Sequence, residues 1–530
     1  MYSWDSGSNM EKYINNLTCY KSLIQFKDSK NTALYFRSKK IDYISLCKRV
    51  DEVADKLYSL GVRKDMVVSL LAPNVIETVE VFYALNKIGA IISILHPLIS
   101  KVELKESILE ANSKMLIILD ARYSDYFEII DELNIPYYFI SAYKDLRAVT
   151  KLGFKLLYSK QLKKVNKEKY LYKIKCNSQS FKINEDNLKP SIYLRSGGTT
   201  GKSKTVIIND YQALFAPSLS KEIIKQDVDN KSMLAVLPFF HGFGLAMGLL
   251  APLNNNASSH LMIDFSSRTI SKEIKHNRIN MLLVIPYMCE KLLDNKHFNS
   301  KNLIATFMGA DKPDIKLFDK YNKKTDSILL EGYGLTETVS VNFVNTIDSY
   351  KVGSVGKPLR YVRFKIVKDD DYSTDIGPNK KGILLINSPS VCLGYLNSES
   401  PFYFDTNGNK WLVTNDVGYY DNDGYLYVLN RKDDVFKIAG YNIFPSEIEN
   451  IVNSFTEVNE SKVIYIKNSK HPYIKLFIEC KQISNEKLLK DSIKKVIVNK
   501  LNRYSVPEEI IIVKKMPRTS LGKIDIDQLN

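Results

Sequence analysis

Short apolar runs alternate with amphipathic segments through the first two thirds of the chain. Residues 77–87 repeat apolar positions at helical spacing, and Gly89 ends this predicted helix. Continuous apolar runs between such helices are typical of parallel strands, which are buried on both faces of a sheet. We therefore expect an α/β fold with a large N-terminal domain of parallel-rich sheets covered by helices. The clearest predicted strands are residues 66–72, 90–95, 114–119, 281–286 and 304–308.

Residues 351–430 follow a different pattern, which is rich in β-branched and aromatic residues. Turn sequences at 406–408 and 421–424 predict hairpins in a smaller antiparallel or β-barrel-like subdomain. Beyond this subdomain, predicted helices and strands mix again, so we place a domain boundary near Asp433. The two expected domains are an N-terminal core of residues 1–432 and an α+β C-terminal domain of residues 433–530.

The composition is that of a globular protein, because 45% of the 530 residues are hydrophobic and 25% are charged. A chain of this length exceeds one hydrophobic core. The net charge of +16 raises the alternative of a nucleic-acid-binding protein. Lysines alternate with acidic residues almost everywhere, however, and no compact arginine and aromatic block marks a nucleic-acid groove. We therefore expect no nucleic-acid partner.

The six cysteines are scattered, and the N-terminus lacks the basic and apolar regions of a signal peptide. Both features favour a cytoplasmic protein with reduced cysteines. Residues 232–263 carry no formal charge, but Pro238, Gly242 and Pro252 interrupt this stretch. We predict buried strand, loop and helix there, and no transmembrane segment.

A run of glycine, threonine and lysine follows the strand-like residues 191–194. Its glycines allow several backbone N–H groups to point at one anion, and its lysines add positive charge. This chemistry suits a polyphosphate, although the run is no Walker A loop and a mobile surface turn is an alternative interpretation. The run consists of Ser196, Gly197, Gly198, Thr199, Thr200, Gly201, Lys202, Ser203 and Lys204.

A second run, residues 331–338, follows an apolar strand and therefore lies where ligands bind in α/β sheets. The Tyr333 ring suits a base, the Thr336 hydroxyl suits a phosphate, and the Glu337 carboxylate suits Mg²⁺. The alternative is a helix N-terminus with Thr336 as its cap and Glu337 as a solvated acid.

Two further runs contain Asp416 with Arg431, and Lys523 near the C-terminus. The carboxylate of Asp416 suits a pair of sugar hydroxyls, and Arg431 adds a donor. Together, in this order and spacing, the four runs resemble the acyl-adenylate-forming enzymes, which include acyl-CoA synthetases, beetle luciferases and peptide-synthetase adenylation domains. The resemblance extends from about residue 20 to the end of the chain.

The resemblance implies ATP-dependent activation of a carboxylic acid to an acyl-adenylate with release of pyrophosphate. Transfer to a thiol, most simply that of coenzyme A, would follow. The loop 196–204 would hold the β- and γ-phosphates, Tyr333 would stack on adenine, and Thr336 would contact the α-phosphate. Glu337 would bind Mg²⁺. The segments that would border the nucleotide include Gly309, Ala310 and Gly332.

The resemblance also assigns roles in and near the C-terminal domain. Asp416 and Arg431 would hold the ribose, and Lys523 would be the catalytic lysine of adenylation. The C-terminal domain would be mobile, with its hinge at Asp433, and Gly440 would lie in the loop that approaches the thiol channel.

His241 lies in an aromatic segment that would line the acyl pocket and gate the carboxylate, although a core histidine is the alternative. Members that activate amino acids usually carry an aspartate nearby, and residues 238–248 contain none. We therefore expect an apolar acid, either fatty or aromatic. The apolar residues that indicate it are Phe239, Phe240, Phe243, Leu245 and Met247.

Some positions depart from the family pattern, which usually has proline at Ser203 and glycine at Thr205 and Asn415. The two departures at the exit of the phosphate loop bear on the stiffness of that loop. The alternatives are an acyl-AMP ligase that loads the phosphopantetheine arm of an acyl or peptidyl carrier protein, and a non-catalytic nucleotide-binding relative.

Overall fold

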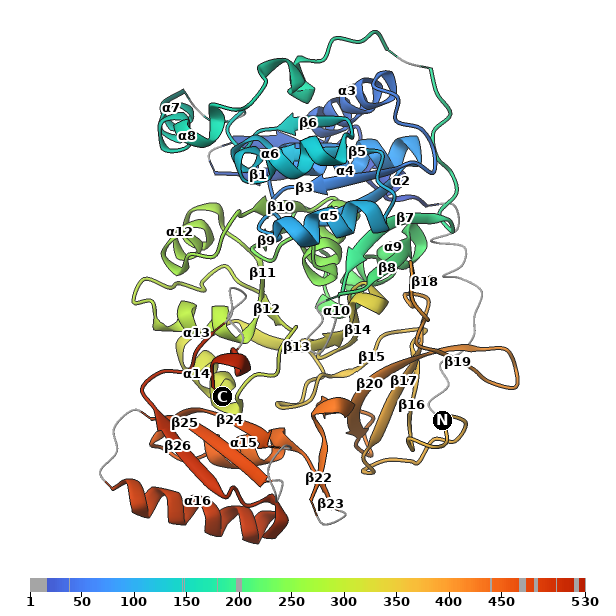
Figure 1. Cartoon of the computed structure of the whole chain (residues 1–530). Coiled ribbons are helices and arrows are strands. Elements are labelled where there is room, and N and C mark those ends of the chain that lie inside the picture. Colours follow the sequence, from blue (N-terminus) through green and yellow to red (C-terminus); the bar gives the residue numbers. More distant parts are fainter. Residues whose placement is uncertain are drawn as a thin grey trace.

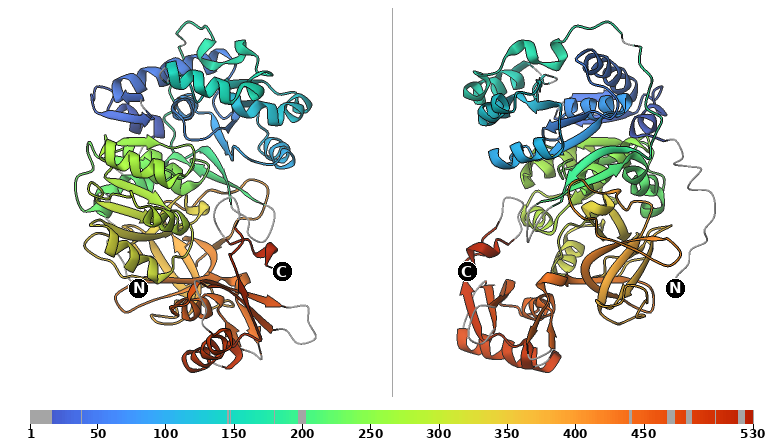
Figure 2. Two further views of the ribbon diagram at one scale, coloured as in Figure 1. Left: turned by 90° about the vertical axis from the view of Figure 1, so that its left-hand side faces the viewer. Right: turned by 45° about the vertical axis from the view of Figure 1, so that its right-hand side comes forward.

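The structure of the protein is a computed structural model, shown in Figure 1. It describes residues 17–37, 39–144, 146, 148–178, 180–196, 203–438, 441–466, 473–480, 485–501, 503–518 and 524–529. The predicted α/β fold is confirmed. Two large sheets follow one another along the molecule, and the small C-terminal α/β unit lies at the end opposite the first sheet (Figures 1 and 2).

The first large sheet has the strand order β18-β8-β7-β4-β3-β5-β6. Strands β3 to β7 pair in parallel, whereas β8 and β18 are antiparallel additions at one edge. The predicted strands at 66–72, 90–95 and 114–119 are confirmed. The strands are β3 (Val67–Leu71), β4 (Ile91–Leu95), β5 (Met115–Leu119), β6 (Tyr137–Ile140), β7 (Pro190–Arg195), β8 (Thr205–Asn209) and β18 (Gly394–Tyr395).

Helices cover this sheet, and the predicted helix at 77–87 is α4, which ends at Gly89 in a left-handed conformation with φ 85°. Its residues are almost all buried, because α4 lies between the sheet and the helices around it. The helices of this part are α2 (Cys19–Ile24), α3 (Tyr43–Ser59), α4 (Ile76–Ile88), α5 (Lys101–Glu110), α6 (Asp120–Leu133), α7 (Ala148–Leu157), α8 (Ser159–Leu162), η1 (Lys167–Lys169) and η2 (Leu171–Lys173).

The second large sheet has the order β15-β14-β13-β12-β11-β9-β10-β1-β2. Its centre, from β13 to β1, is parallel, and its two edges are antiparallel. The predicted strands at 281–286 and 304–308 are confirmed. The strands are β1 (Thr32–Phe36), β2 (Lys39–Asp42), β9 (Ser232–Ala235), β10 (Ser258–Leu261), β11 (Met281–Val284), β12 (Ala305–Met308), β13 (Ile328–Gly334), β14 (Val341–Val344) and β15 (Lys357–Pro358).

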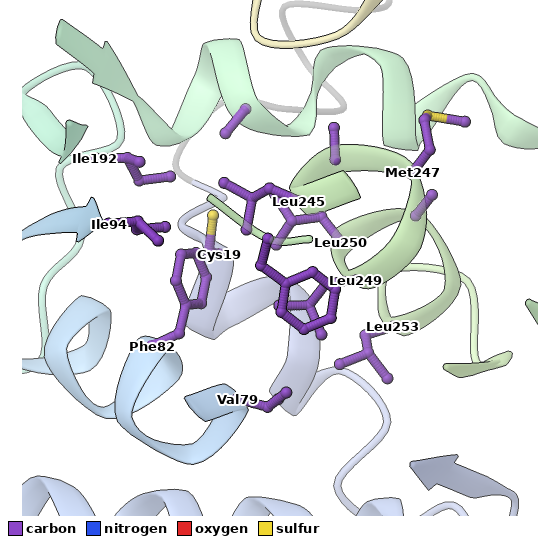
Figure 3. Packing of buried hydrophobic residues seen from close by; sticks show 14 of the residues in the cluster. Cys19, Val79, Phe82, Ile94, Ile192, Leu245, Met247, Leu249, Leu250 and Leu253 are labelled. Atoms are coloured by element: carbon purple, nitrogen blue, oxygen red, sulfur yellow. The ribbon is translucent and has the colours of Figure 1, made fainter. Parts of the chain in front are cut away.

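One hydrophobic cluster joins the two sheets. Figure 3 shows Ile94 and Ile192 of the first sheet facing Leu245 and Leu250 of η3, a π-helix at Gly244–Leu250. The uncharged stretch 232–263 is therefore buried strand, loop and helix, as predicted. The helices that follow β8 in the N-terminal part are, besides η3, α9 (Asp210–Ser218), α10 (Ser220–Ile224), α11 (Ala251–Leu253), α12 (Ser267–Asn277), α13 (Pro286–Asp294), α14 (Ile315–Lys324) and η4 (Thr336–Thr338).

The predicted antiparallel subdomain is a five-stranded sheet in which all pairings are antiparallel. The predicted turns at 406–408 and 421–424 connect β19 to β20 and β20 to β21. The strands are β16 (Arg363–Val367), β17 (Gly382–Asn387), β19 (Phe402–Phe404), β20 (Lys410–Tyr420) and β21 (Leu426–Arg431).

The C-terminal unit has its own hydrophobic cluster, in which Ile448 of α15 and Ile493 of α16 pack on the sheet β24-β25-β26. None of the helices in the described part of the chain has the length and hydropathy needed to span a membrane. The elements are η5 (Lys432–Asp434), β22 (Phe436–Ile438), β23 (Tyr441–Ile443), α15 (Pro445–Asn453), β24 (Val458–Ile466), β25 (Tyr473–Cys480), α16 (Glu486–Lys500), η6 (Arg503–Ser505), β26 (Glu509–Val513) and η7 (Ile526–Gln528).

Gly356 joins the second sheet to the antiparallel subdomain, and a side chain there should destabilise the protein. Its φ is +89°, and a Cβ would lie 2.0 Å from the carbonyl carbon of Val344. Gly377 is the matched control, because its φ is +86° but a Cβ there meets nothing within 4 Å. We expect Gly377→Ala to lower the free energy of unfolding by about 1 kcal/mol and Gly356→Ala to lower it clearly more. The thermal midpoints of the two variants, compared with that of the wild type, check this order. Equal losses would contradict the close packing.

Candidate functional site

Three of the predicted runs meet at the carboxyl edge of the second large sheet. Gly309 and Ala310 follow the last residue of β12, and β13 carries Gly332 and Tyr333 at its own end. A Cβ on Gly309 would lie 3.3 Å from the carbonyl oxygen of Gly332, so the two segments are neighbours. Parallel strands bring these segments together because their carboxyl ends lie at one edge.

A hydrogen-bonded triad links this edge to the antiparallel subdomain. The Tyr333 hydroxyl donates to Asp416 Oδ2, and Arg431 Nε lies 3.0 Å from Asp416 Oδ1. Asp416 and Arg431 are direct cross-strand partners on β20 and β21. Burial raises the pKa of Asp416, whereas Arg431 and the Tyr333 hydroxyl act in the opposite direction. A carboxylate held in this way, with an exposed guanidinium beside it, suits vicinal hydroxyl groups.

The loop after β13 touches the segment of His241. Gly242 directly follows His241. A Cβ on Gly242 would lie 1.7 Å from the carbonyl oxygen of Val339, so only glycine fits this contact. Val339 itself has φ 59°, which is strained for a β-branched residue. The ring of His241 lies beside Phe240, with centroids 4.6 Å apart. The structure thus brings His241 to the edge that carries Thr336 and Glu337.

The turn that follows β13 does not use Thr336 as a helix cap. The Leu335 N–H donates instead to Thr338 Oγ1 at 3.0 Å, and Thr338 is buried. The structure therefore does not show the capping role that was the alternative interpretation of Thr336.

Glu337 is half-buried and lies close to the end of the phosphate loop. Its Oε1 accepts a hydrogen bond of 2.7 Å from the Tyr395 hydroxyl. The ammonium group of Lys204 lies 4.6 Å from the centroid of the Tyr395 ring. Glu337 and Lys204 therefore both contact Tyr395. A negative and a positive group thus lie at the same edge of the second large sheet.

The base of the predicted phosphate loop is closed by hydrogen bonds. Ser196 N–H donates to Lys204 O at 2.8 Å, and Lys204 N–H donates to Ser196 Oγ at 3.1 Å. The hydroxyl of Ser203 donates to Ser196 O at 2.7 Å, a bond that proline cannot make. The atypical Thr205 accepts from Arg195 at 3.2 Å. Both departures from the family pattern thus tie the loop base together.

Glu331 was not singled out as a functional residue from the sequence. It is 5% exposed, and its Oε2 has no hydrogen-bond partner. Burial raises its pKa to about 8, against which only the charge of Lys312 acts. It lies two residues before Tyr333. The sequence shows only that an acidic residue stands at the end of an apolar strand. The burial of its side chain could not be predicted from this position.

Comparison with known proteins fits this geometry. Residues 25–396 match the AMP-binding enzyme family, and residues 447–523 match the AMP-binding enzyme C-terminal domain. The chain belongs to the AMP-binding enzyme family. The predicted resemblance to acyl-adenylate-forming enzymes is therefore confirmed.

The relatives of this AMP-binding enzyme include ligases of two kinds. A 2-succinylbenzoate–CoA ligase of Listeria monocytogenes is 27% identical, over 94% of this chain and 96% of its own. A long-chain-fatty-acid–CoA ligase of Salmonella typhimurium is 25% identical, over 88% and 85%.

Solved structures share the fold. ATP-bound MatB from Rhodopseudomonas palustris has a TM-score of 0.82 at 19% identity, covering 97% of this chain and 98% of its own. The o-succinylbenzoate CoA synthetase of Bacillus subtilis with OSB-AMP has a TM-score of 0.78 at 22% identity, with the same coverage.

The remaining predicted residues of the family site lie partly outside the described residues. Residues 197–202, Gly440 and Lys523 fall there, so their predicted roles stay predictions. Asp433 lies in η5, is exposed, and follows directly on β21, where Arg431 joins the triad. The predicted hinge position is thus a short connection between the antiparallel subdomain and the C-terminal unit.

The donor set at this edge fits a magnesium ion carried by phosphate. Among the described residues, no group of three or more potential metal-ligating side chains occurs. Glu337 offers one carboxylate, beside the hydroxyl-bearing Thr336. Mg²⁺ is usually held by one or two carboxylates plus substrate phosphates, so a single glutamate suffices.

The raised pKa of Glu331 predicts a pH-dependent stability. The folded protein binds this proton more tightly than the unfolded chain, whose ordinary pKa is 4.5. Stability should therefore fall as the pH rises from 4.5 to about 8. Glu331→Gln should remove this loss, so its thermal midpoint should gain on that of the wild type between about pH 5 and about pH 8.5. A difference between Glu331→Gln and the wild type that stays constant over this pH range would refute the assignment.

Proposed function

We propose that the protein activates a carboxylic acid with ATP, releases pyrophosphate, and transfers the acyl group to the thiol of coenzyme A. The observation that supports this most is the contact of Tyr333, Asp416 and Arg431 beside Glu337 and Lys204. This arrangement offers a base-stacking ring, a ribose-binding carboxylate and a phosphate-binding region at one edge. The CoA ligase relatives support the acid and thiol substrates.

Each group has a part in the proposed first step. Tyr333 stacks on the base, Asp416 and Arg431 hold the ribose hydroxyls, and Gly309, Ala310 and Gly332 leave room for the base. The loop 196–204 holds the β- and γ-phosphates, Thr336 contacts the α-phosphate, and Glu337 holds Mg²⁺. When bound, the ion neutralises charge on the departing pyrophosphate.

The C-terminal unit supplies the catalytic lysine in this proposal and moves between the two steps. Residues 433–530 form a mobile domain on the core 1–432, with Asp433 as its hinge. Lys523 stabilises the negative charge that develops between carboxylate and α-phosphate, and then withdraws so that the thiol approaches past Gly440. The separate hydrophobic cluster of this unit supports a domain that moves as one body.

The acid is apolar in this proposal, fatty or aromatic. The segment that begins at His241 continues into η3, whose residues are all buried and carry no charge. Met247 belongs to this segment, and a methionine side chain adapts to apolar groups of different shape, which suits the hydrocarbon part of an acid.

A screen for pyrophosphate release tests the function. Fatty acids of increasing chain length and aromatic acids are supplied with ATP, Mg²⁺ and coenzyme A. We expect release that depends on one of these acids, and no release with any of them would refute the proposal. Lys523→Ala should lower acyl-adenylate formation at least about a hundredfold while ATP still binds, because one positioned charge acts in the transition state. Replacing coenzyme A by a phosphopantetheine-loaded carrier protein distinguishes the alternative acceptor.

The ribose contact gives a second prediction. Asp416→Asn removes the charge from a hydrogen-bonded carboxylate and should raise the KM for ATP about tenfold. Asp421→Asn is the matched control on the same hairpin, because Asp421 pairs with Lys351 and does not touch Tyr333 or Arg431. Its KM for ATP should stay near that of the wild type. A similar KM in both variants would show that Asp416 does not hold the nucleotide.

A further inference from the structure

The Arg518 side chain connects the C-terminal unit to the N-terminal part. Its Nη2 donates to Glu460 Oε2 of β24 at 2.6 Å. On its other side, the guanidinium lies 5.0 Å from the centroid of the Tyr287 ring in α13. The side chains of Arg518 and Glu460 are 24% and 31% exposed, so this contact is largely shielded from solvent. Figure 1 shows the C-terminal segment beside α13.

The chain around Arg518 is fixed to the sheet of the C-terminal unit. The Met516 N–H donates to Glu479 Oε2 at 2.7 Å, and Met516 is buried. Arg518 and Ile524 pair as an antiparallel bridge, and the Asp525 N–H donates to Pro517 O at 2.9 Å. Lys523, which is bonded to Ile524, lies outside the described residues. Arg518 therefore holds against α13 a bridge whose other residue, Ile524, directly follows that lysine in the chain.

Acidic groups surround the guanidinium from both parts. Burial raises the pKa of Glu460 to about 7, and Arg518 acts against this while Glu290 of α13 and Asp311 add to it. Burial also raises the pKa of Glu290, again opposed by Arg518. Without the guanidinium, Glu290 and Glu460 would face each other across the contact. Loss of Arg518 thus removes an attraction and exposes a repulsion between like charges.

Two further contacts between the two parts lie away from Arg518 and Ile524. Lys381 lies 2.5 Å from Glu447 of α15, and Lys316 donates to the Phe455 carbonyl at 2.7 Å. They join the two parts through α15 and the residues after it. The Lys381 pair therefore serves as a matched control for a general weakening of the interface.

We propose that Arg518 is a positioning residue for the acid-activating step, acting by holding its bridge with Ile524, from which the chain leads to Lys523, against α13. This inference rests on the proposed function. In this proposal the first step takes place in the observed arrangement of the two parts, which the contact favours. The contact has to break when the C-terminal unit turns for the thiol step, so the thiol step does not depend on it.

The test measures the two half-reactions separately. The first is single-turnover formation of acyl-adenylate from ATP and the acid that gives most pyrophosphate in the screen. The second is formation of acyl-CoA from chemically prepared acyl-adenylate. Arg518→Ala should slow the first about tenfold, the equivalent of one partly shielded cation–π and ion-pair contact, and leave the second within about twofold. Arg518→Lys should recover part of the first rate.

Variants on α13 test the same contact from the other side. Tyr287→Ala should slow only the first half-reaction, whereas Tyr287→Phe, which keeps the ring face, should not. Glu290→Gln should partly restore Arg518→Ala, because it removes one of the facing charges. Lys381→Ala should leave both half-reactions within about twofold of the wild type, since its contact is with α15 and does not hold the chain that leads to Lys523.

The outcomes separate the two proposals. A wild-type protein that activates no acid overturns the proposed function, and this inference with it. An active wild type whose Arg518→Ala and Tyr287→Ala variants slow both half-reactions equally, or neither, overturns only the role of Arg518. If Arg518→Ala does not fold, Tyr287→Ala decides alone, because Tyr287 lies on the other part of the protein.

Discussion

The buried carboxylate of Asp416 is the interaction on which the arrangement of the parts depends. It accepts a hydrogen bond from the Tyr333 hydroxyl of the second large sheet and forms an ion pair with Arg431 on the neighbouring strand of the antiparallel subdomain. Arg431 is followed directly by the connection to the C-terminal unit. Two parts of the molecule therefore meet at one carboxyl group, and the third part follows in the chain directly after Arg431. Since an unpaired buried charge is costly, this convergence also fixes the register of the hairpin that carries Asp416 and Arg431.

Patterns that depend on neighbouring residues were predictable from the sequence. The continuous apolar runs identified the inner strands of both sheets, and Gly89 ended α4 as predicted because a left-handed residue is needed there. The turn at 421–424 was equally clear, since asparagine, aspartate and glycine favour tight turns. These features depend on local backbone preferences and on burial, which the order of residues expresses directly.

Features that depend on long-range packing were not predictable in this way. The order of the nine strands in the second sheet places β10 beside β1, which are far apart in the chain. The absence of a partner at Glu331 Oε2, and the position of Arg518 between Glu460 and Tyr287, arise from segments that meet only after folding. The four runs of the site could be recognised because their residue types indicate their chemistry. The distances between the runs could not be predicted from the sequence.

The π-helix η3 has a consequence for the number of residues that its segment holds. Its hydrogen bonds span five residues, as between the Ala251 N–H and Ala246 O, so each turn contains more residues than an α-helical turn. Deleting one residue between Gly244 and Leu250 would allow an ordinary α-helix and would change which side chains of this segment face its neighbours. Met247 and its neighbours would then face other surroundings, with no residue exchanged. Segment length is therefore a variable through which the apolar lining can change.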